Sequence, residues 1–309
     1  MPDNELFYKH SGRFEAGGIA WSFAAMVAVG VVLGFVYGAL AWLVPSVYLV
    51  IFGCAGLGAG VGLLCAQLTI AAKTRNKELI ILGPTLASFA ALYAAWSGYF
   101  FAASDWVSLI LNPIEIFEIA QLNAKNGMWS VFGTTPKGIM LWLIWLAEAG
   151  IILGLATFLG ADKPAHLPFN ENADAWADQT ETLPPAKAMS NHTIKQIRQQ
   201  LAAGDVSCFG LFEPLDYEDA AMHTSFRVNW AAGHEAEQFL SITSITITQD
   251  EQGNVSTKKD PIAVNMIIDP EARAVIDDIL ASGPQLGEGM GDTEEYEDSP
   301  TDEGDGGEG

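Results

Sequence analysis

Two long apolar runs, residues 19–44 and 47–72, are separated only by Pro45 and Ser46 and constrain this chain more than any other feature. Each run has about 26 residues, and a helix needs about 20 apolar residues to cross the hydrocarbon core of a bilayer. Two further runs, 79–103 and 138–159, have the same character. The sequence therefore predicts an α-helical transmembrane bundle of four spans within residues 19–160.

The first run is expected to stay in the protein, because it is much longer than the apolar part of a cleavable signal peptide. Basic residues occur in the polar segment 1–18, and Lys73, Arg75 and Lys77 follow the second run. Basic flanks stay on the cytoplasmic side of a membrane. We therefore expect residues 1–18 to be a cytosolic N-terminal segment, both termini to be cytoplasmic, and the protein to lie in a bacterial inner (cytoplasmic) membrane.

A short amphipathic helix over residues 113–126 is predicted between the third and fourth spans. Asn112 and Pro113 form a helix start, Glu115 is suited to reach back to it, and Gly127 supplies a stop. The helix has one polar stripe on an otherwise apolar surface. It is expected on the outer side, where it lies in the membrane interface or caps the bundle; the sequence leaves both options open.

The C-terminal half is polar and divides into three parts. Residues 161–189 are rich in proline, alanine and acidic residues and are interpreted as a linker. Residues 190–283 predict a cytosolic α-β-β-β-α domain, with a bulge or a doubly buried stretch in the strand 239–248 and an interruption of the last strand at Pro261. Residues 284–309 are acidic and glycine-rich, which predicts a disordered acidic tail. The fold class is thus a transmembrane bundle with a small α+β domain.

Charge and motif content exclude several function classes. The chain carries a formal net charge of -22, which comes almost wholly from the C-terminal half and disfavours nucleic acid and anionic lipid as partners of that half. Cys54, Cys65 and Cys208 cannot form a disulfide framework. The histidines and cysteines show no metal-ligand spacing, and no catalytic motif is found. We expect no metal, no cofactor and no enzyme activity.

Glycines recur at helical spacing in the first two spans. Gly30, Gly34 and Gly38 share one face of the first span. In the second span Gly56 and Gly60 share one spacing of four residues, and Gly58 and Gly62 share another. Small residues let transmembrane helices approach closely. The spacing predicts that this hairpin packs tightly, either on itself or against a second copy in a homo-oligomer.

Glu148 is the candidate functional residue inside the membrane, because an intramembrane carboxyl is costly and no cation lies within a span to pair with it. The candidate partners are hydroxyl and amide side chains of the other spans, namely Gln67, Tyr37, Tyr93 and Ser97. Two interpretations remain open: a neutral carboxylic acid that joins two helices by a hydrogen bond, and a relay for protons or cations.

Several short motifs carry a family resemblance: residues 8–12 before the first span, Pro45 with Tyr48, residues 73–76, residues 126–130, and residues 142–149. At these places the chain resembles a group of uncharacterised bacterial four-span membrane proteins with a cytosolic C-terminal domain and no known activity. Members of that group often carry cysteine pairs suggestive of a small metal site. The comparable segments here, 170–176 and 230–234, contain no cysteine, so the resemblance implies the fold without the metal.

The function that these features favour is an integral membrane scaffold or interaction subunit that presents a cytosolic domain. Its expected partners are the lipid bilayer, a protein bound by the cytosolic domain or the acidic tail, and a second copy of the chain at the glycine-rich hairpin. The alternative is a small transporter or channel component that uses Glu148.

Overall fold

Four long apolar helices form the N-terminal half of the protein. The computed structural model describes residues 6–44, 47–128, 134–215, 221–250 and 252–281, so Pro45, Ser46 and the expected tail 284–309 lie outside the described residues. The helices are α1 (Ala16–Leu43), α2 (Val47–Ala71), α3 (Lys77–Ala103) and α5 (Ile139–His166). All four are long and apolar enough to cross a membrane, which confirms the four predicted apolar helices.

The first two spans do not pack mainly on each other. The most extensive helix contacts are those of α1 with α3 and of α2 with α5, followed by those of α3 with α5. A Cβ atom at Gly30, Gly34 or Gly38 would overlap a backbone carbonyl oxygen of α3, at Ala87, Ala91 and Ala95 respectively. The glycine face of α1 therefore packs against α3. The expectation that the glycines pack the first two spans against each other is wrong. The glycine spacing marks a face for close approach but does not identify the helix that approaches it.

The glycines of α2 divide between a packed and an open face. A Cβ atom at Gly58 would lie 3.0 Å from the carbonyl oxygen of Ile152, and one at Gly62 would lie 2.8 Å from that of Ala156, so both glycines admit α5. A Cβ atom at Gly60 would meet only the side chain of Leu33, at 3.7 Å, and one at Gly56 would have no described neighbour within 4 Å. Of the two predicted pairs, Gly58 and Gly62 thus form the tight helix contact of α2, and Gly56 and Gly60 do not.

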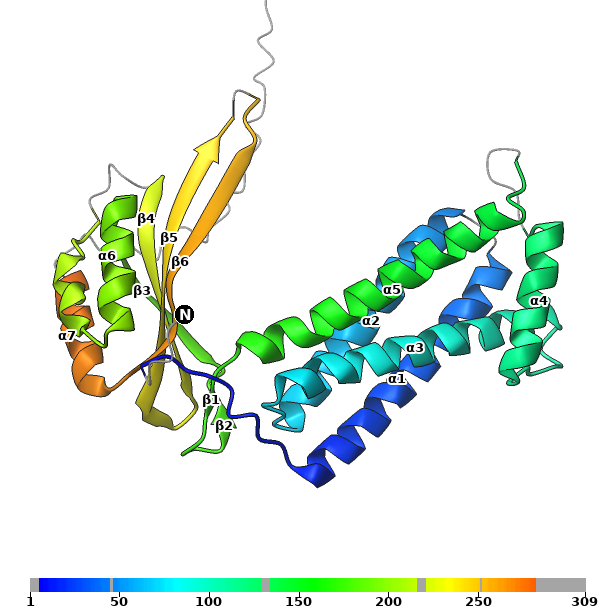
Figure 1. Cartoon of the computed structure of the whole chain (residues 1–309), viewed down its shortest axis with the longest axis horizontal. Helices are drawn as coiled ribbons and strands as arrows, with labels where there is room; N and C mark the ends of the chain where they lie inside the picture. Colours follow the sequence, from blue (N-terminus) through cyan, green and yellow to red (C-terminus); the bar gives the residue numbers. More distant parts are fainter. Residues whose placement is uncertain (1–5, 45–46, 129–133, 216–220, 251, 282–309) are drawn as a thin grey trace, which may run out of the picture.

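Helix α4 (Pro113–Asn126) has the predicted bounds and crosses the end of the bundle that is farthest from the sheet domain (Figure 1). The Asn112 side chain accepts a hydrogen bond from the backbone N–H of Ile114, and Gly127 ends the helix with φ of 83°. One face of α4 is buried against the bundle, and the aromatic ring of Phe117 packs near that of Trp142 of α5.

The C-terminal half is an α+β domain, as predicted. Its main sheet is antiparallel with strand order β3-β4-β5-β6, and helices α6 and α7 cover one face of it (Figure 1). The core lies between that face and the helices, around Phe226, Leu240, Ile197 and Ile276. The elements are β1 (Phe169–Asn170), β2 (Ala175–Trp176), β3 (Gln179–Lys187), α6 (Asn191–Ala202), a 3-10 turn (Val206–Leu211), β4 (Met222–Ala231), β5 (His234–Gln249), β6 (Val255–Ile268) and α7 (Pro270–Ala281).

The segment 161–189 is not a linker. Helix α5 continues to His166, the short strands β1 and β2 form a hairpin, and β3 adds a fourth strand to the sheet. Pro184 and Pro185 are tolerated because β3 is an edge strand whose register shifts between Leu183 and Ala186. The domain therefore starts about 20 residues earlier than the proline content suggested.

The irregularity predicted in the second strand is present in the pairing of β5 with β6. The register shifts between Leu240 and Ile242 and again between Ile242 and Thr243. Pro261 lies opposite Thr243, where the disturbed ladder accommodates a residue without an N–H group. A continuous strand β6 is the result, even though it contains a proline.

Substitution of single glycines tests the helix pairing. We expect Gly34→Ala to lower the stability of the bundle by about 1–3 kcal/mol, because the new methyl group meets backbone atoms of Ala91. Gly154→Ala in α5 is the matched control: its methyl group has no described neighbour within 4 Å, and alanine favours a helix by about 1 kcal/mol over glycine. Thermal unfolding in mild detergent measures both. Equal effects of the two substitutions would show that α1 and α3 do not pack through this face.

Candidate functional site

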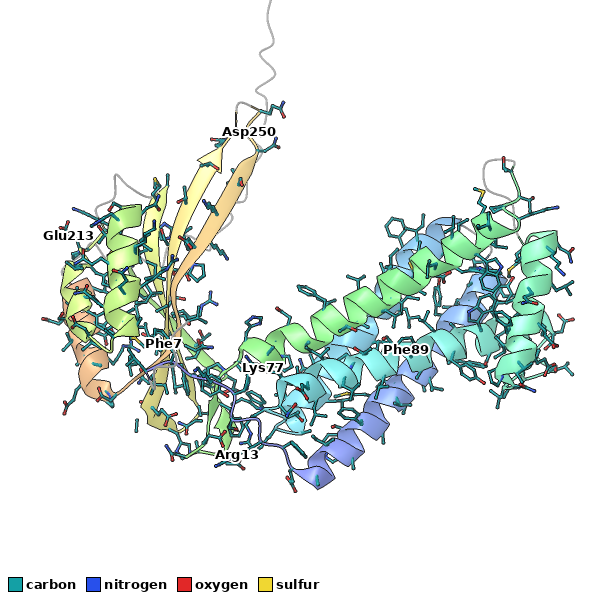
Figure 2. The ribbon with its side chains drawn as sticks, in the orientation of Figure 1. Phe7, Arg13, Lys77, Phe89, Glu213 and Asp250 are labelled. Atoms are coloured by element: carbon teal, nitrogen blue, oxygen red, sulfur yellow. The ribbon has the colours of Figure 1, made fainter. Side chains whose placement is uncertain are left out.

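The N-terminal segment pairs with the sheet of the C-terminal domain. Phe7 bridges Met266 of β6 in antiparallel fashion. The N–H of Ile267 donates to the carbonyl oxygen of Leu6 at 2.8 Å, and the N–H of Tyr8 donates to that of Asn265 at 2.9 Å. Figure 2 shows Phe7 at the sheet, and its side chain packs against the core between the sheet and the helices α6 and α7. Residues 6–8 therefore pair with the edge strand β6 before the chain reaches the helical bundle.

Aromatic and imidazole rings continue from this edge toward the bundle. The Tyr8 ring packs edge-on against Phe239 of β5 and against His10, with centroid distances of 5.4 and 5.3 Å. His10 Nε2 lies 3.0 Å from the carbonyl oxygen of Ala165 in α5, and its Nδ1 lies 3.1 Å from the Tyr8 hydroxyl. Trp176 of β2 donates its indole N–H to the carbonyl oxygen of Ile70 in α2 at 2.8 Å. These contacts connect the sheet to two of the membrane helices.

A cluster of ion pairs lies beside these rings and is centred on Arg75, in the loop between α2 and α3. Its guanidinium donates to Glu171 Oε2 at 3.0 Å and stacks over the ring of Phe169, 4.2 Å from the centroid. Lys73 Nζ is 2.6 Å from Asp174 Oδ2, and the backbone N–H of Arg75 donates to the carbonyl oxygen of Arg13. The Arg75 side chain is only 12% exposed, so water screens its interactions weakly. We call this region, residues 6–13, 70–76 and 165–176, the junction.

The junction joins three segments that are far apart in the sequence. Figure 2 labels Phe7 at the sheet and Arg13 and Lys77 at the near end of the bundle, and the junction lies between them. The hairpin of β1 and β2 also contacts β4, and Asn172 Nδ2 donates to Glu237 Oε2 of β5 at 3.0 Å. The hairpin is therefore held by the membrane helices on one side and by the sheet on the other.

Burial changes the acidity of groups in the junction. Desolvation raises the pKa of Tyr8 to about 12, so the phenol is neutral and can donate its hydrogen bond to His10. Desolvation also lowers the pKa of His10 below its ordinary value of 6.5, although the carbonyl of Ala165 opposes this shift. The hydrogen bond from Lys73 lowers the pKa of Asp174. At neutral pH the junction thus combines a neutral imidazole with charged ion pairs.

Glu148, the site residue predicted from the sequence, lies in α5 and meets Tyr37 of α1. The Tyr37 hydroxyl donates to Glu148 Oε1 at 2.5 Å, and both side chains are half-buried. Gly53 of α2 makes room for the phenol ring, because a Cβ atom there would lie 2.7 Å from Tyr37 Cε2. The hydrogen bond joins helices α1 and α5.

The other three candidate partners of Glu148 form no hydrogen bond with it among the described residues. The Tyr93 hydroxyl donates to the carbonyl oxygen of Leu111, and the Ser97 hydroxyl donates to that of Tyr93. Gln67 forms no hydrogen bond with Glu148 in the described part of the chain. The site is thus a pair of side chains, Glu148 and Tyr37, in an interface of three helices.

The junction was missed by sequence reasoning. The spacing of Lys73 and Arg75 after an apolar run indicates only orientation, and their acidic partners Glu171 and Asp174 lie in a segment whose composition predicts a linker. A signal was present: Phe169 and Trp176 are large aromatic residues in an otherwise polar stretch, and both are buried.

The fold and the junction define a class: a multi-pass membrane protein whose four apolar helices carry an α+β domain fixed to one end of the bundle. No protein family, curated protein or solved structure matches the chain. The functional argument therefore depends on the geometry of the junction and of the Glu148 pair.

Acidification tests the role of His10. The pKa of His10 is lowered in the folded protein. Below pH 6.5 the imidazole is therefore protonated more readily when the N-terminal segment is undocked than when it is docked, and protonation favours the undocked state. We expect the docking of the domain to be strongest above pH 6.5 and to weaken as the pH falls from there through the lowered pKa. Amide hydrogen exchange of residues 6–10 and 169–176 measures the docking, and His10→Gln should make it less dependent on pH. A pH profile that His10→Gln leaves unchanged would assign the effect to other groups.

Proposed function

We propose that the protein is an integral scaffold or interaction subunit of a bacterial inner membrane, with both termini in the cytoplasm, and that the bundle presents the α+β domain to a protein partner. The observation that carries this proposal is the junction. A domain that only needs attachment to a membrane is served by a flexible linker. Here the domain is held by a paired N-terminal strand, an indole hydrogen bond and a cluster of ion pairs.

A fixed orientation favours a scaffold for a physical reason. A partner that contacts both the domain and the membrane surface binds more tightly when their relative position is already set, because less conformational entropy is lost on binding. The junction provides such preorganisation. The expected partner is a protein bound by the α+β domain or by the acidic tail, and nucleic acid is not expected because of the charge of the soluble half.

Disruption of the junction tests the scaffold function. Hydrogen bonds to charged groups contribute about 1.5–3 kcal/mol, so Arg75→Ala should weaken docking of the domain about tenfold or more. Lys77→Ala is the matched control, because Lys77 is an exposed cation two residues away with no ion pair among the described residues. We expect proteins that cross-link and co-purify with the unmodified chain in mild detergent to be depleted with Arg75→Ala and retained with Lys77→Ala.

Equal recovery of partners with both variants, while circular dichroism shows both folded, would contradict the proposal that fixed presentation of the domain is the function. The absence of any stoichiometric partner of the unmodified chain would contradict the scaffold role altogether.

A second candidate function is a small transporter or channel component, and the observation that favours it is the hydrogen bond between Tyr37 and Glu148. Burial of a carboxyl group inside a helical bundle costs free energy, so the carboxyl groups that occur there are often functional. Proton relays use such groups. The purely structural interpretation is that the pair fastens α1 to α5.

Substitution of the pair separates these two interpretations. If Glu148 carries protons or cations, Glu148→Gln abolishes a flux that the unmodified protein supports in proteoliposomes, while Tyr37→Phe alters the flux but keeps the carboxyl. If the pair is structural, Glu148→Gln leaves folding and association nearly intact, since an amide oxygen still accepts from Tyr37. The absence of flux in the unmodified protein would exclude the transporter.

The resemblance to uncharacterised four-span membrane proteins with a cytosolic domain belongs to the same proposal. Of the segments that the resemblance compares with the cysteine pairs of that group, 170–176 forms the hairpin of β1 and β2, and this hairpin contacts β4, the strand that ends at Ala231. In this chain Asn170 Oδ1 accepts hydrogen bonds from the N–H groups of Asn172 and Ala173. We propose that such hydrogen bonds hold the hairpin in place of a metal ion.

A homo-oligomer stays part of the proposal, but with a different surface. The glycines Gly30, Gly34 and Gly38 are occupied by α3 and cannot also receive a second copy. Gly56 has space around it and is the glycine of the predicted set that a neighbouring subunit can approach.

A further inference from the structure

The sheet of the α+β domain has a second face that α6 and α7 do not cover. Side chains along a strand alternate between the two faces, so residues between core positions lie on this second face. On β4 they include Ser225 and Arg227, on β5 Thr243 and Ile245, and on β6 Lys259 and Pro261, which the strand registers place opposite one another. We call this surface the open face.

The two faces of β6 are distinguished by a contact with α6. Arg198 of α6 pairs with Asp260 at 2.8 Å, so Asp260 lies on the helix-covered side, and Lys258 shares that side. Lys259, between them, therefore lies on the open face. Adjacent lysines thus have opposite orientations on one strand, and both are exposed.

The part of the open face that lies away from the junction carries positive charge, although the chain as a whole is acidic. The chain contains 37 acidic residues and 15 basic ones. Among the open-face positions of β4 between His223 and Arg227, of β5 between Ser241 and Ile247, and of β6 between Thr257 and Pro261, none is aspartate or glutamate. Arg227 and Lys259 are exposed there and form no ion pair in the part of the chain that the structure describes. The part of the open face away from the junction is thus a basic surface rich in hydroxyl groups, and Glu237 of β5 lies at its other end, against the hairpin of β1 and β2.

The open face is directed toward the bundle. In Figure 1 the sheet lies between α6 and α7 on one side and the membrane helices on the other. Contacts agree with the picture: Asn265 of β6, which shares a hydrogen bond with Ser241 on the open face, donates to the carbonyl oxygen of His166 at the end of α5. Lys163 lies three residues before His166 in α5, which corresponds to about 4–5 Å along the helix axis. The open face thus starts where the membrane helix ends.

We propose that the open face docks on the anionic phospholipid headgroups of the bilayer that surrounds the bundle. Arg227 and Lys259 would contact headgroup phosphates, and the neighbouring serine and threonine hydroxyls would donate hydrogen bonds to the same oxygens. The argument is charge complementarity together with the position of the face at the end of α5. The net charge of the soluble half predicted the reverse, because it averages over two faces of opposite sign. This inference requires the membrane placement but not the scaffold role.

Site-specific quenching in nanodiscs tests the proposal with the full-length protein. An environment-sensitive fluorophore is attached at Thr243→Cys on the open face or, as control, at Thr246→Cys on the opposite side of the same strand; the native cysteines are buried. A quencher is carried by the lipid headgroups. We expect strong quenching at position 243 in discs of equal parts phosphatidylcholine and phosphatidylglycerol, weak quenching in phosphatidylcholine alone, and little at position 246 in either.

Charge reversal provides the matched pair. A cation near an anionic membrane contributes binding free energy, so replacing it by an anion should shift the equilibrium between docked and undocked domain about tenfold toward the undocked state. Added salt should shift this equilibrium in the same direction, because it screens the attraction. We expect this shift for Lys259→Glu and not for Lys258→Glu, although both change the net charge equally. Equal effects of the two lysine variants, or equal quenching at positions 243 and 246, would overturn the proposal. Shielding of position 243 in both lipids would also overturn it and would assign the face to a protein segment.

Discussion

The contact of Arg75 with the hairpin of β1 and β2 is the interaction on which the arrangement of the two halves depends. One guanidinium pairs with Glu171, covers the ring of Phe169 and lies in a loop whose backbone is bonded to Arg13. Arginine suits this position because its planar group pairs and stacks at the same time. Three segments from different parts of the sequence converge there, so the loop between α2 and α3 acts as the platform for the α+β domain.

Close helix packing in the bundle determines where that platform lies. Gly30, Gly34 and Gly38 bring α1 against α3, and Gly58 and Gly62 bring α2 against α5. Gly18 extends the same effect to the near end of the bundle, since a Cβ atom there would lie 3.3 Å from the carbonyl oxygen of Ala72. The start of α1 thus lies beside the loop that holds Arg75, which places Arg13 within reach. The small residues inside the bundle set the positions of the helices, and these positions bring the charged residues at the end of the bundle together.

The sequence predicted the elements better than their partners. Spans are readable because lipid demands about 20 apolar residues in a row, and the caps of α4 are readable because they are local. The partner of the glycine face is set by the whole bundle and has no local signal. Strand β3 was missed because two prolines suggested a linker, although an edge strand accommodates them at an irregularity. The pairing of residues 6–8 with β6 connects segments about 260 residues apart in the sequence, so local patterns do not predict it either.

The central claim is that the domain is held in one position relative to the bundle, and a distance measurement between spin labels tests it most directly. Labels at Lys163→Cys in α5 and Gln196→Cys in α6 occupy exposed positions on the two halves. The account predicts one narrow distance distribution in nanodiscs at neutral pH. A broad distribution, as expected for a domain on a flexible linker, would contradict it.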